Sequence, residues 1–468
     1  MNDPVKSIAL PLAVLVVILL TWVVFAGPPS NRGALAEAGS GDTSSPGMTP
    51  LVGVGENGAA PVSAPSGAAS EPSSQALSRA QDLNDQAAAA LSGGRSAEAV
   101  LLLESAHGLA PDDLVLTRNL AFAHYRVAEG LMAVQDMEGA GAAFRRAWAL
   151  DGSQSAYGLH AASLSLRAFS LDAALAQLEQ VLASHPESGS GQLMRGDVLN
   201  LLDRLDEALL AYDLAALHGD ATVAQGAAQG RARTERQLDV ERDYVSEETE
   251  YFVVRHPPAS DHLQLLGVLE RARVEVCHAL GDFPSHKALV VLYPPEAFRA
   301  VTGTHDWVGG LFDRKIRLPI ADLATSAAQV ESAFRHEFSH LMVSEWNPRC
   351  PTYLNEGLAQ VMEYGRDQGL KRLVDHLDGR GLSRESLPAL DELPDSFMSM
   401  ADREAVSLGY LLSYAFVDHV VKHHGMGALV RWIVAHEQAP IDEAYHDATG
   451  RTLAHEEELF RELVRTAR

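Results

Sequence analysis

Cysteine is scarce in this sequence, because only Cys277 and Cys350 occur among 468 residues. They form no CxxC pair and no other zinc-finger spacing, which excludes a thiolate metal site and a disulfide-stapled scaffold. Two interpretations of the pair stay open. In an oxidising compartment the thiols could form a disulfide, and otherwise they are two isolated buried thiols.

Positive charge is also in short supply. Lys and Arg number 37 against 62 Asp and Glu, so the formal net charge is −25 at pH 7. Binding to nucleic acid requires a basic face, so we expect no nucleic acid partner. The same balance argues against a peripheral protein held on anionic lipid. At 468 residues with 47% apolar composition, the chain is long enough for two or three folded units with substantial cores.

One long apolar run stands near the N-terminus. Residues 8–26 read IALPLAVLVVILLTWVVFA without a charge, which meets the length of about 20 residues that a membrane-spanning helix needs. Lys6 precedes the run and Trp22 lies near its far end, as is typical of an anchor. We therefore predict a transmembrane anchor over residues 1–27 in a bacterial inner membrane, with the bulk of the chain in the periplasm or outside the cell. A signal peptide cleaved after Ala26 is the alternative, and it exports the same part of the chain.

The next two segments differ in periodicity. Residues 28–76 are rich in Gly, Ser, Pro and Ala without apolar periodicity, which predicts a disordered linker. Residues 77–238 have helical spacing, with breaks at Pro111, Asp151, Pro186 and Asp220. These intervals of 40, 35 and 34 residues approach the 34-residue tetratricopeptide period.

Small and large residues recur at fixed places before these breaks. The first unit has Ala87, Ala99, Leu103 and Ala106, the third has Ala162, Ala174, Leu178 and Val181, and the last has Gly196, Ala208, Tyr212 and Ala215. The second unit carries about six extra residues relative to this period. The pattern resembles tetratricopeptide repeats and predicts an all-α solenoid, whose concave surface suits a protein partner. An irregular helical bundle is the alternative.

Residues 245–468 form the third predicted unit. Strands are expected over 251–256 and 288–293, with a helix between them. An extended hairpin or strand is expected over 310–320, and helices from about residue 326 onward. Strands followed by helices indicate an α+β domain. The charged segment 231–246 is expected to be a solvated helix that leads into this domain.

The stretch from Ser326 to Ser344 carries the chemistry. Ser326 and Gln329 fit a capping box, and Phe334, Phe338, Leu341 and Met342 form one apolar stripe. His336 and His340 are four residues apart and therefore lie one turn apart on the same face. With the adjacent Glu337 they complete an HExxH motif, in which two imidazoles bind zinc and the glutamate acts as general base.

The third metal ligand is not on this helix. The extended motif HExxHxxGxxH is excluded, because Val343 and Trp346 stand at its glycine and histidine positions. The segment 351–364 reads PTYLNEGLAQVMEY, with Thr352 as the expected N-cap and Glu356 in the first turn of a following helix. Glu345 is a poorer candidate because it points elsewhere on the first helix. We expect Zn²⁺ to be bound by His336, His340 and Glu356.

HEFSH followed by YLNEGLA resembles the gluzincin peptidases, closest to small bacterial peptidase MA-like domains, over about residues 247–468. The resemblance implies a zincin-like catalytic domain with Glu337 as general base and later proton donor. It makes Asn355 and Glu363 candidates for orienting the ligands, with ordinary polar helix positions as the alternative.

The same resemblance suggests two further roles. A tyrosine on a later helix would stabilise the oxyanion, and Tyr410 is favoured over Tyr414 for this role, with packing alone as the remaining alternative. Gly309 and Gly310 would let a substrate strand approach the strand near residues 307–313, although a plain turn fits the same residues.

Further histidines lack a matching pattern. His419 and His423 are four apart, but Val420 stands where a catalytic glutamate would be. We interpret these two, together with His424, His446 and His455, as surface or core histidines and not as a second metal site.

Together these features predict a membrane-anchored zinc metallopeptidase that hydrolyses peptide bonds of extracytoplasmic proteins or peptides, with a repeat domain that recruits protein. The main alternative is a non-enzymatic repeat scaffold with a vestigial or structural metal domain. Structural zinc sites are usually closed by four protein ligands, whereas this one offers three beside Glu337, which favours the enzyme.

Overall fold

The computed structural model describes residues 73–467, apart from residues 135, 169, 259–261, 305–309, 321–322, 395–396 and 398–401. The predicted anchor, most of the predicted linker, Trp307 and Gly309 lie outside the described residues. No helix among the described residues has both the length and the apolar character needed to cross a membrane. The described residues form two compact units, one of 73–200 and 206–231 and the other of 201–205 and 232–467.

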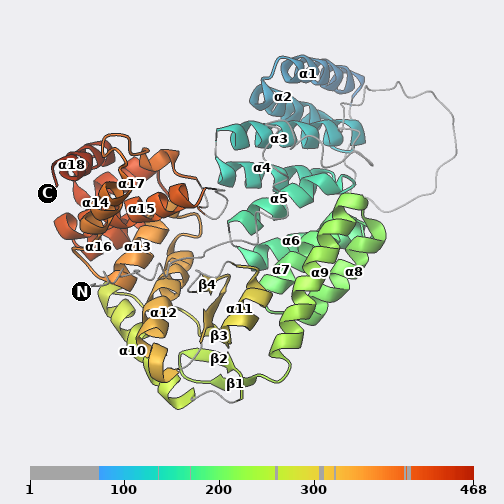
Figure 1. The fold of residues 1–468 in the computed structure, drawn as a ribbon. Helices are drawn as coiled ribbons and strands as arrows, with labels where there is room; N and C mark the ends of the chain where they lie inside the picture. Colours follow the sequence, from blue (N-terminus) through green and yellow to red (C-terminus); the bar gives the residue numbers. More distant parts are fainter. Residues whose placement is uncertain are drawn as a thin grey trace, which may run out of the picture. The chain divides into compact units, whose positions relative to one another are not determined.

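The first unit is made of helices. They run in the order α1 (Ser74–Ser92), α2 (Ser96–Leu109), α3 (Leu114–Ala133), α4 (Met137–Leu150), α5 (Ser155–Arg167), α6 (Leu171–Ser184), α7 (Gly189–Leu201), α8 (Leu205–His218) and α9 (Ala221–Glu241). Helices α1 to α6 pack each against the next (Figure 1). The extra residues of the second repeat lie in α3, which has 20 residues where α5 has 13. This arrangement is a helical-repeat architecture.

The predicted packing positions of the repeats are buried. Ala87, Ala99, Leu103, Ala106, Ala162, Ala174, Leu178, Val181, Ala208 and Ala215 are all 0% exposed. Gly196 shows why a small residue is needed, because a Cβ there would come within 2.6 Å of the Tyr212 ring. The Tyr212 hydroxyl donates a hydrogen bond to the buried Asp197 at 2.8 Å. Small residues therefore let the helices approach, as the repeat pattern predicts.

The second unit contains a mixed sheet of five strands in the order β1-β2-β3-β5-β4. The strands are β1 (Val245–Glu248), β2 (Phe252–His256), β3 (Ala288–Tyr293), β4 (Leu311–Phe312) and β5 (Lys315–Pro319). β2, β3 and β5 are parallel to one another, while β1 and β4 pair antiparallel with β2 and β5. β4 is thus a short edge strand, paired along one side with β5.

β2 and β3 match the predicted strands, β4 and β5 form the hairpin expected over 310–320, and β1 was not predicted. The expected charged helix over 231–246 ends at Glu241, and the chain then turns into β1. VSEE is polar, and three of its four residues are exposed, so it lacks the apolar alternation that predicts a strand. Its backbone pairing with β2 is what makes it extended. The unit boundary accordingly falls inside α9 and not at the predicted position between 238 and 245.

Helices cover both faces of the sheet. Val290, Leu292, Ile316 and Leu318 face a core that also contains residues of α10 (His262–Leu280) and α12 (Leu323–Trp346). Val291, Tyr293 and Leu311 pack on the other face with α11 (Pro295–Thr302). The remaining elements are α13 (Thr352–Tyr364), α14 (Gly369–Arg380), the short 3-10 helix η2 (Leu390–Glu392), α15 (Arg403–His424), α16 (Met426–Ala435), α17 (Ile441–Thr449) and α18 (Leu453–Thr466).

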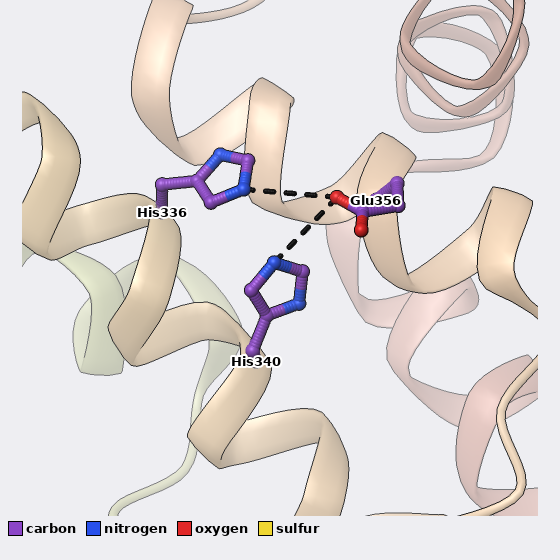
Figure 2. A group of neighbouring side chains, drawn as sticks. All are labelled: His336, His340 and Glu356. Carbon is purple, nitrogen blue, oxygen red and sulfur yellow. Dashed lines mark ion pairs between the residues drawn. The ribbon is translucent and has the colours of Figure 1, made fainter. Parts of the chain in front are cut away.

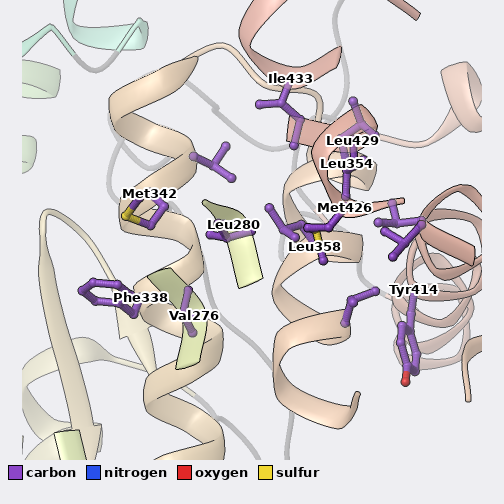
Figure 3. Packing of buried hydrophobic residues seen from close by; sticks show 14 of the residues in the cluster. Val276, Leu280, Phe338, Met342, Leu354, Leu358, Tyr414, Met426, Leu429 and Ile433 are labelled. Carbon is purple, nitrogen blue, oxygen red and sulfur yellow. The ribbon is translucent and has the colours of Figure 1, made fainter. Parts of the chain in front are cut away.

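The large core holds the two helices of the predicted site in place. Figure 3 shows Phe338 and Met342 of α12 near Val276 and Leu280 of α10, with Leu358 of α13 in the same cluster. The predicted stripe of α12 (Phe334, Phe338, Leu341 and Met342) is at most 3% exposed. A rigid apolar core therefore fixes the position of the polar face of α12.

Two predicted helix starts are wrong. α12 begins at Leu323, so Ser326 lies inside the helix and is not its N-cap. The N-cap of α13 is Pro351, and Thr352 is the first helical residue. Proline fixes the extended backbone that precedes a first turn without offering a side-chain acceptor. Both cysteines are free thiols in this structure, with Cys277 buried and Cys350 partly exposed.

Candidate metal centre

Three side chains that could bind one metal ion meet between α12 and α13. His336 and His340 lie one turn apart on α12, with ring centroids 4.8 Å apart. The Oε2 atom of Glu356, on α13, lies 3.7 Å from Nε2 of His336 and 3.6 Å from Nε2 of His340. Figure 2 shows both imidazoles directed at this one carboxylate. The fold thus brings together the three residues that the sequence predicted as ligands.

The geometry of these atoms fits a metal ion better than a set of hydrogen bonds. A tetrahedral zinc ion with bonds of about 2.0–2.2 Å holds its ligand atoms about 3.3–3.6 Å apart. The two distances above are close to this spacing and too long for hydrogen bonds. Nε2 of both histidines and Oε2 of Glu356 are buried without a hydrogen-bond partner. Three buried polar atoms that face one point without partners require a further group to satisfy them.

Each histidine has a second residue at its other ring nitrogen. Nδ1 of His340 donates a hydrogen bond to Oδ1 of Asn355 at 2.8 Å, which leaves the Nε2 lone pair directed at the site. Nδ1 of His336 lies 2.9 Å from a carboxylate oxygen of Glu363 in an ion-pair contact. Such partners fix the orientation of metal-binding imidazoles. Asn355 therefore holds His340 by a hydrogen bond, whereas Glu363 reaches His336 only in an ion-pair contact, since neither of those two atoms has a hydrogen-bond partner.

Negative charge is concentrated around the two imidazoles. Burial lowers the pKa of His336, but the carboxylates of Glu356 and Glu363 outweigh burial and raise it well above its usual value. Burial and the neighbouring His336 together lower the pKa of His340 well below its usual value. The two rings therefore differ in how readily they take a proton, and three acidic side chains, Glu337, Glu356 and Glu363, lie close to them. A divalent cation would balance this charge without protonating the second ring.

Glu337 is buried beside the three candidate ligands, with 1% of the residue exposed. Burial, together with Glu356, Glu363 and Asp313, raises its pKa well above the usual range, while His336 opposes the shift. One carboxylate oxygen has no hydrogen-bond partner. A carboxylate with a raised pKa and a free oxygen is suited to accept and return a proton.

Gly310 leaves the space that the Glu337 carboxylate occupies. A Cβ at Gly310 would lie 2.6 Å from Oε1 of Glu337, closer than van der Waals contact allows. Gly310 directly precedes the edge strand β4, so the backbone at the sheet edge passes against the carboxylate. This glycine therefore lets the backbone approach Glu337, which is a different contact from the predicted approach of a substrate strand. Gly309 lies outside the described residues.

The structure separates the two tyrosine candidates. The Tyr414 hydroxyl donates a hydrogen bond to the carbonyl of Gly365 at 2.7 Å and is thereby committed to packing. Burial and the charges of Glu356 and Glu337 raise the pKa of Tyr410 well above its usual value, so its hydroxyl stays protonated near the site. The Tyr410 ring packs edge-on against Phe397, with centroids 4.6 Å apart. Tyr410 is the better placed of the two as a hydrogen-bond donor.

Two residues that support the site were not predicted. Gln360 is 2% exposed and donates a hydrogen bond to the backbone carbonyl of Tyr410 at 2.9 Å. Gly357 lets α13 approach α15, because a Cβ there would meet the Ser413 carbonyl at 2.5 Å. Gln360 follows Glu356 by one turn, so helical spacing alone could have suggested it. Its partner on α15, 50 residues away, could not be read from the sequence.

Glu345 takes no part in the cluster. Its carboxylate accepts a hydrogen bond from the backbone N–H of Ser285 at 3.0 Å and lies 3.2 Å from His286. The sequence argument that it points elsewhere on α12 agrees with this position.

No protein-family model matches the chain, and no curated protein matches it. Among solved structures, the chain is similar to "MamA RS-1 ArsTM double mutant" at 17% identity and a TM-score of 0.23, over 34% of this chain and 97% of the other. It is also similar to a mutant form of the Thermobaculum terrenum O-GlcNAc transferase at 11% identity and a TM-score of 0.25, over 84% of this chain and 98% of the other. Both TM-scores are low, so the description of the repeats rests on the helices themselves.

Proposed function

We propose that the chain is a zinc-dependent metallopeptidase whose metal is held by His336, His340 and Glu356. The observation that carries the proposal is the convergence of three buried, unpartnered ligand atoms beside the buried carboxylate of Glu337. When bound, a zinc ion with three protein ligands leaves a position for water and lowers the pKa of that water toward 7. The rest of the chemistry falls to side chains of this chain.

Glu337 is the proposed general base. It lies buried beside the three candidate ligands, where it would take a proton from the attacking water and give it to the leaving amine. Tyr410 is proposed to donate a hydrogen bond to the carbonyl oxygen as negative charge develops on it. Glu337 must be ionisable because it takes up a proton, and the Tyr410 hydroxyl must stay protonated because it donates a hydrogen bond to the developing oxyanion.

The edge strand β4 is the proposed docking strand for substrate. Its residues pair with β5 along one side, and Gly310 at its start lies against Glu337. An extended peptide that paired with this edge would pass beside the general base. Peptide bonds of an extended protein segment are therefore the proposed substrate.

The repeat unit supports a second, separate proposal of protein recruitment. Its helical pairs offer an extended surface of the kind that repeat arrays use to hold protein partners. Ala99→Glu would place a charge in a fully buried position between the first two helices. We expect slower cleavage of a folded protein substrate and unchanged cleavage of a short peptide. An equal loss with both substrates would argue against recruitment.

The proposed location follows only from the sequence of residues 8–26, which favours a membrane anchor in a bacterial inner membrane with the peptidase outside the cytoplasm. Fractionation of cells that express the full chain tests this proposal. Recovery in the soluble extracytoplasmic fraction would instead indicate a cleaved signal peptide.

Hydrolysis of peptides is the test of the proposed activity. The full chain should cut an unstructured protein into peptides visible by mass spectrometry, and a zinc chelator should abolish the cleavage. Glu337→Gln should retain zinc and lose activity by at least about 100-fold, the lower range for a general base. Glu345→Gln, on the same helix but outside the cluster, is the matched control and should retain activity. Equal activity of Glu337→Gln and wild type would refute Glu337 as the general base, and no cleavage by the zinc-loaded wild type would favour the scaffold alternative.

A further inference from the structure

A second cluster of metal-binding side chains lies at the end of α15, where the sequence predicted ordinary histidines. His419 and His423 are four residues apart on α15, and their ring centroids stand 4.2 Å apart. Glu456 of α18 joins them, and one ligand atom from each of the three residues lies within 4.8 Å of the others. Among the residues that the structure describes, this spacing recurs only here and at His336, His340 and Glu356.

The carboxylate of Glu456 is held with one oxygen directed at the histidine pair. Its Oε2 atom lies 3.0 Å from Nε2 of His424 and 3.4 Å from Nη1 of Arg451. Its Oε1 atom lies 2.9 Å from Nε2 of His419. Glu456 is 0% exposed, so this orientation is imposed by packing as well as by charge. Both carboxylate oxygens therefore already have partners, and Oε1 is held at the histidine pair by His419.

One of the two histidines is oriented as a metal ligand usually is. Nδ1 of His423 donates a hydrogen bond to the backbone carbonyl of His419 at 2.8 Å, which leaves the lone pair of Nε2 for a metal. Nδ1 of His419 is buried without a hydrogen-bond partner, in a residue that is 8% exposed. His423 is exposed, so an ion can enter from solvent.

We propose that His419, His423 and Glu456 form a second site for a divalent transition metal of the zinc class. Two imidazoles and a carboxylate suit zinc and its neighbours better than magnesium or calcium. The site is structural and not hydrolytic, because Val420 occupies the position that Glu337 has in the first site. The ion would join α15, which also carries Tyr410, to α18 near the end of the chain.

The existing contacts of Glu456 compete with the metal and lower the affinity of the site for it. The proton shared by His419 and Glu456 must leave, and the charge of Arg451 opposes a cation. Arg451 is at the longer distance and its side chain is 48% exposed, so it can turn toward water. We therefore expect binding that is weaker than at the first site, where the three facing atoms have no competing partner.

Zinc stoichiometry of the untagged full chain tests the second site. After chelator treatment and titration with zinc alone, wild type should bind two ions and His423→Ala should bind one. His423 is exposed, so its removal should leave the fold intact. His455→Ala removes another exposed histidine, on α18, and should still bind two ions. Equal stoichiometry of wild type and His423→Ala would overturn the proposal.

A second background separates this proposal from the first site. His340→Ala should bind one ion, with a rise in Tm on zinc addition, and His340→Ala with His423→Ala should show neither. Loss of all zinc in the single variant His340→Ala would overturn the second site. Zinc retained in the double variant would mean that the second ion binds elsewhere. Failure of peptide hydrolysis with two ions bound would affect only the proposed activity.

Discussion

The hydrogen bond between His340 and Asn355 offers the sharpest test of how the candidate site is oriented. In Asn355→Ala, Nδ1 of His340 loses the acceptor that lies 2.8 Å away. The His340 side chain is 0% exposed, so water does not replace that acceptor. Without metal, the ring can move its proton to Nε2. With zinc on Nε2, the proton must stay on Nδ1, buried and unpaired.

The cost therefore appears in metal binding. A buried unsatisfied N–H costs about 1–3 kcal/mol, which agrees with the roughly 10- to 100-fold loss of metal affinity usual for such partners. Competition with a chromophoric chelator measures the zinc Kd, in the His423→Ala background so that only the first site is counted. We expect a rise of about 10- to 100-fold in Asn355→Ala.

Asn355→Asp is the matched control, because it keeps an oxygen at the same place. It should bind zinc as tightly as wild type or more tightly, since the carboxylate is a stronger acceptor. An unchanged Kd in Asn355→Ala would refute the reasoning, as would an equal loss in Asn355→Asp.

Three further predictions concern other parts of the structure. Gly310→Ala should displace the Glu337 carboxylate and lower kcat with little change in zinc content, whereas Gly379→Ala, where a Cβ meets nothing, should retain activity. Burial raises the pKa of Cys277 to about 11, so its thiolate is rare at pH 8. Alkylation of Cys277, followed by mass spectrometry, should therefore be slow in the folded chain until the pH approaches that value, and fast in urea. Fast labelling of the folded chain at pH 8 would contradict this prediction. Leu103→Ala removes a fully buried side chain and should destabilise the repeat unit by about 2–5 kcal/mol in urea unfolding, while Leu101→Ala, 66% exposed, should change little.

The sequence was sufficient where local periodicity decides the structure. The strand over 288–293 and the apolar stripe of α12 follow from alternation and helical spacing. The repeat positions follow from their period, because small residues such as Ala99 and Ala208 recur before each break. His336 and His340 needed only the four-residue spacing of one helix.

The sequence was insufficient where partners are distant along the chain. Glu456 lies 37 residues from His419, and no motif links them, so the second cluster was missed. β1 was missed because its polar residues gain their extended form from pairing with β2. The sequence favoured Tyr410 over Tyr414, but the hydrogen bond that holds Tyr414 to the carbonyl of Gly365 is visible only in the fold.

The central claim is that two imidazoles and one carboxylate of this chain hold zinc beside Glu337. X-ray absorption at the zinc edge tests it most directly, on the full chain carrying His423→Ala and loaded with a single equivalent. The account predicts a first shell of nitrogen and oxygen only, at about 2.0–2.2 Å, with two imidazole rings, and loss of zinc in Glu356→Ala. Sulfur at about 2.3 Å, fewer imidazoles, or an unchanged spectrum in Glu356→Ala would contradict it.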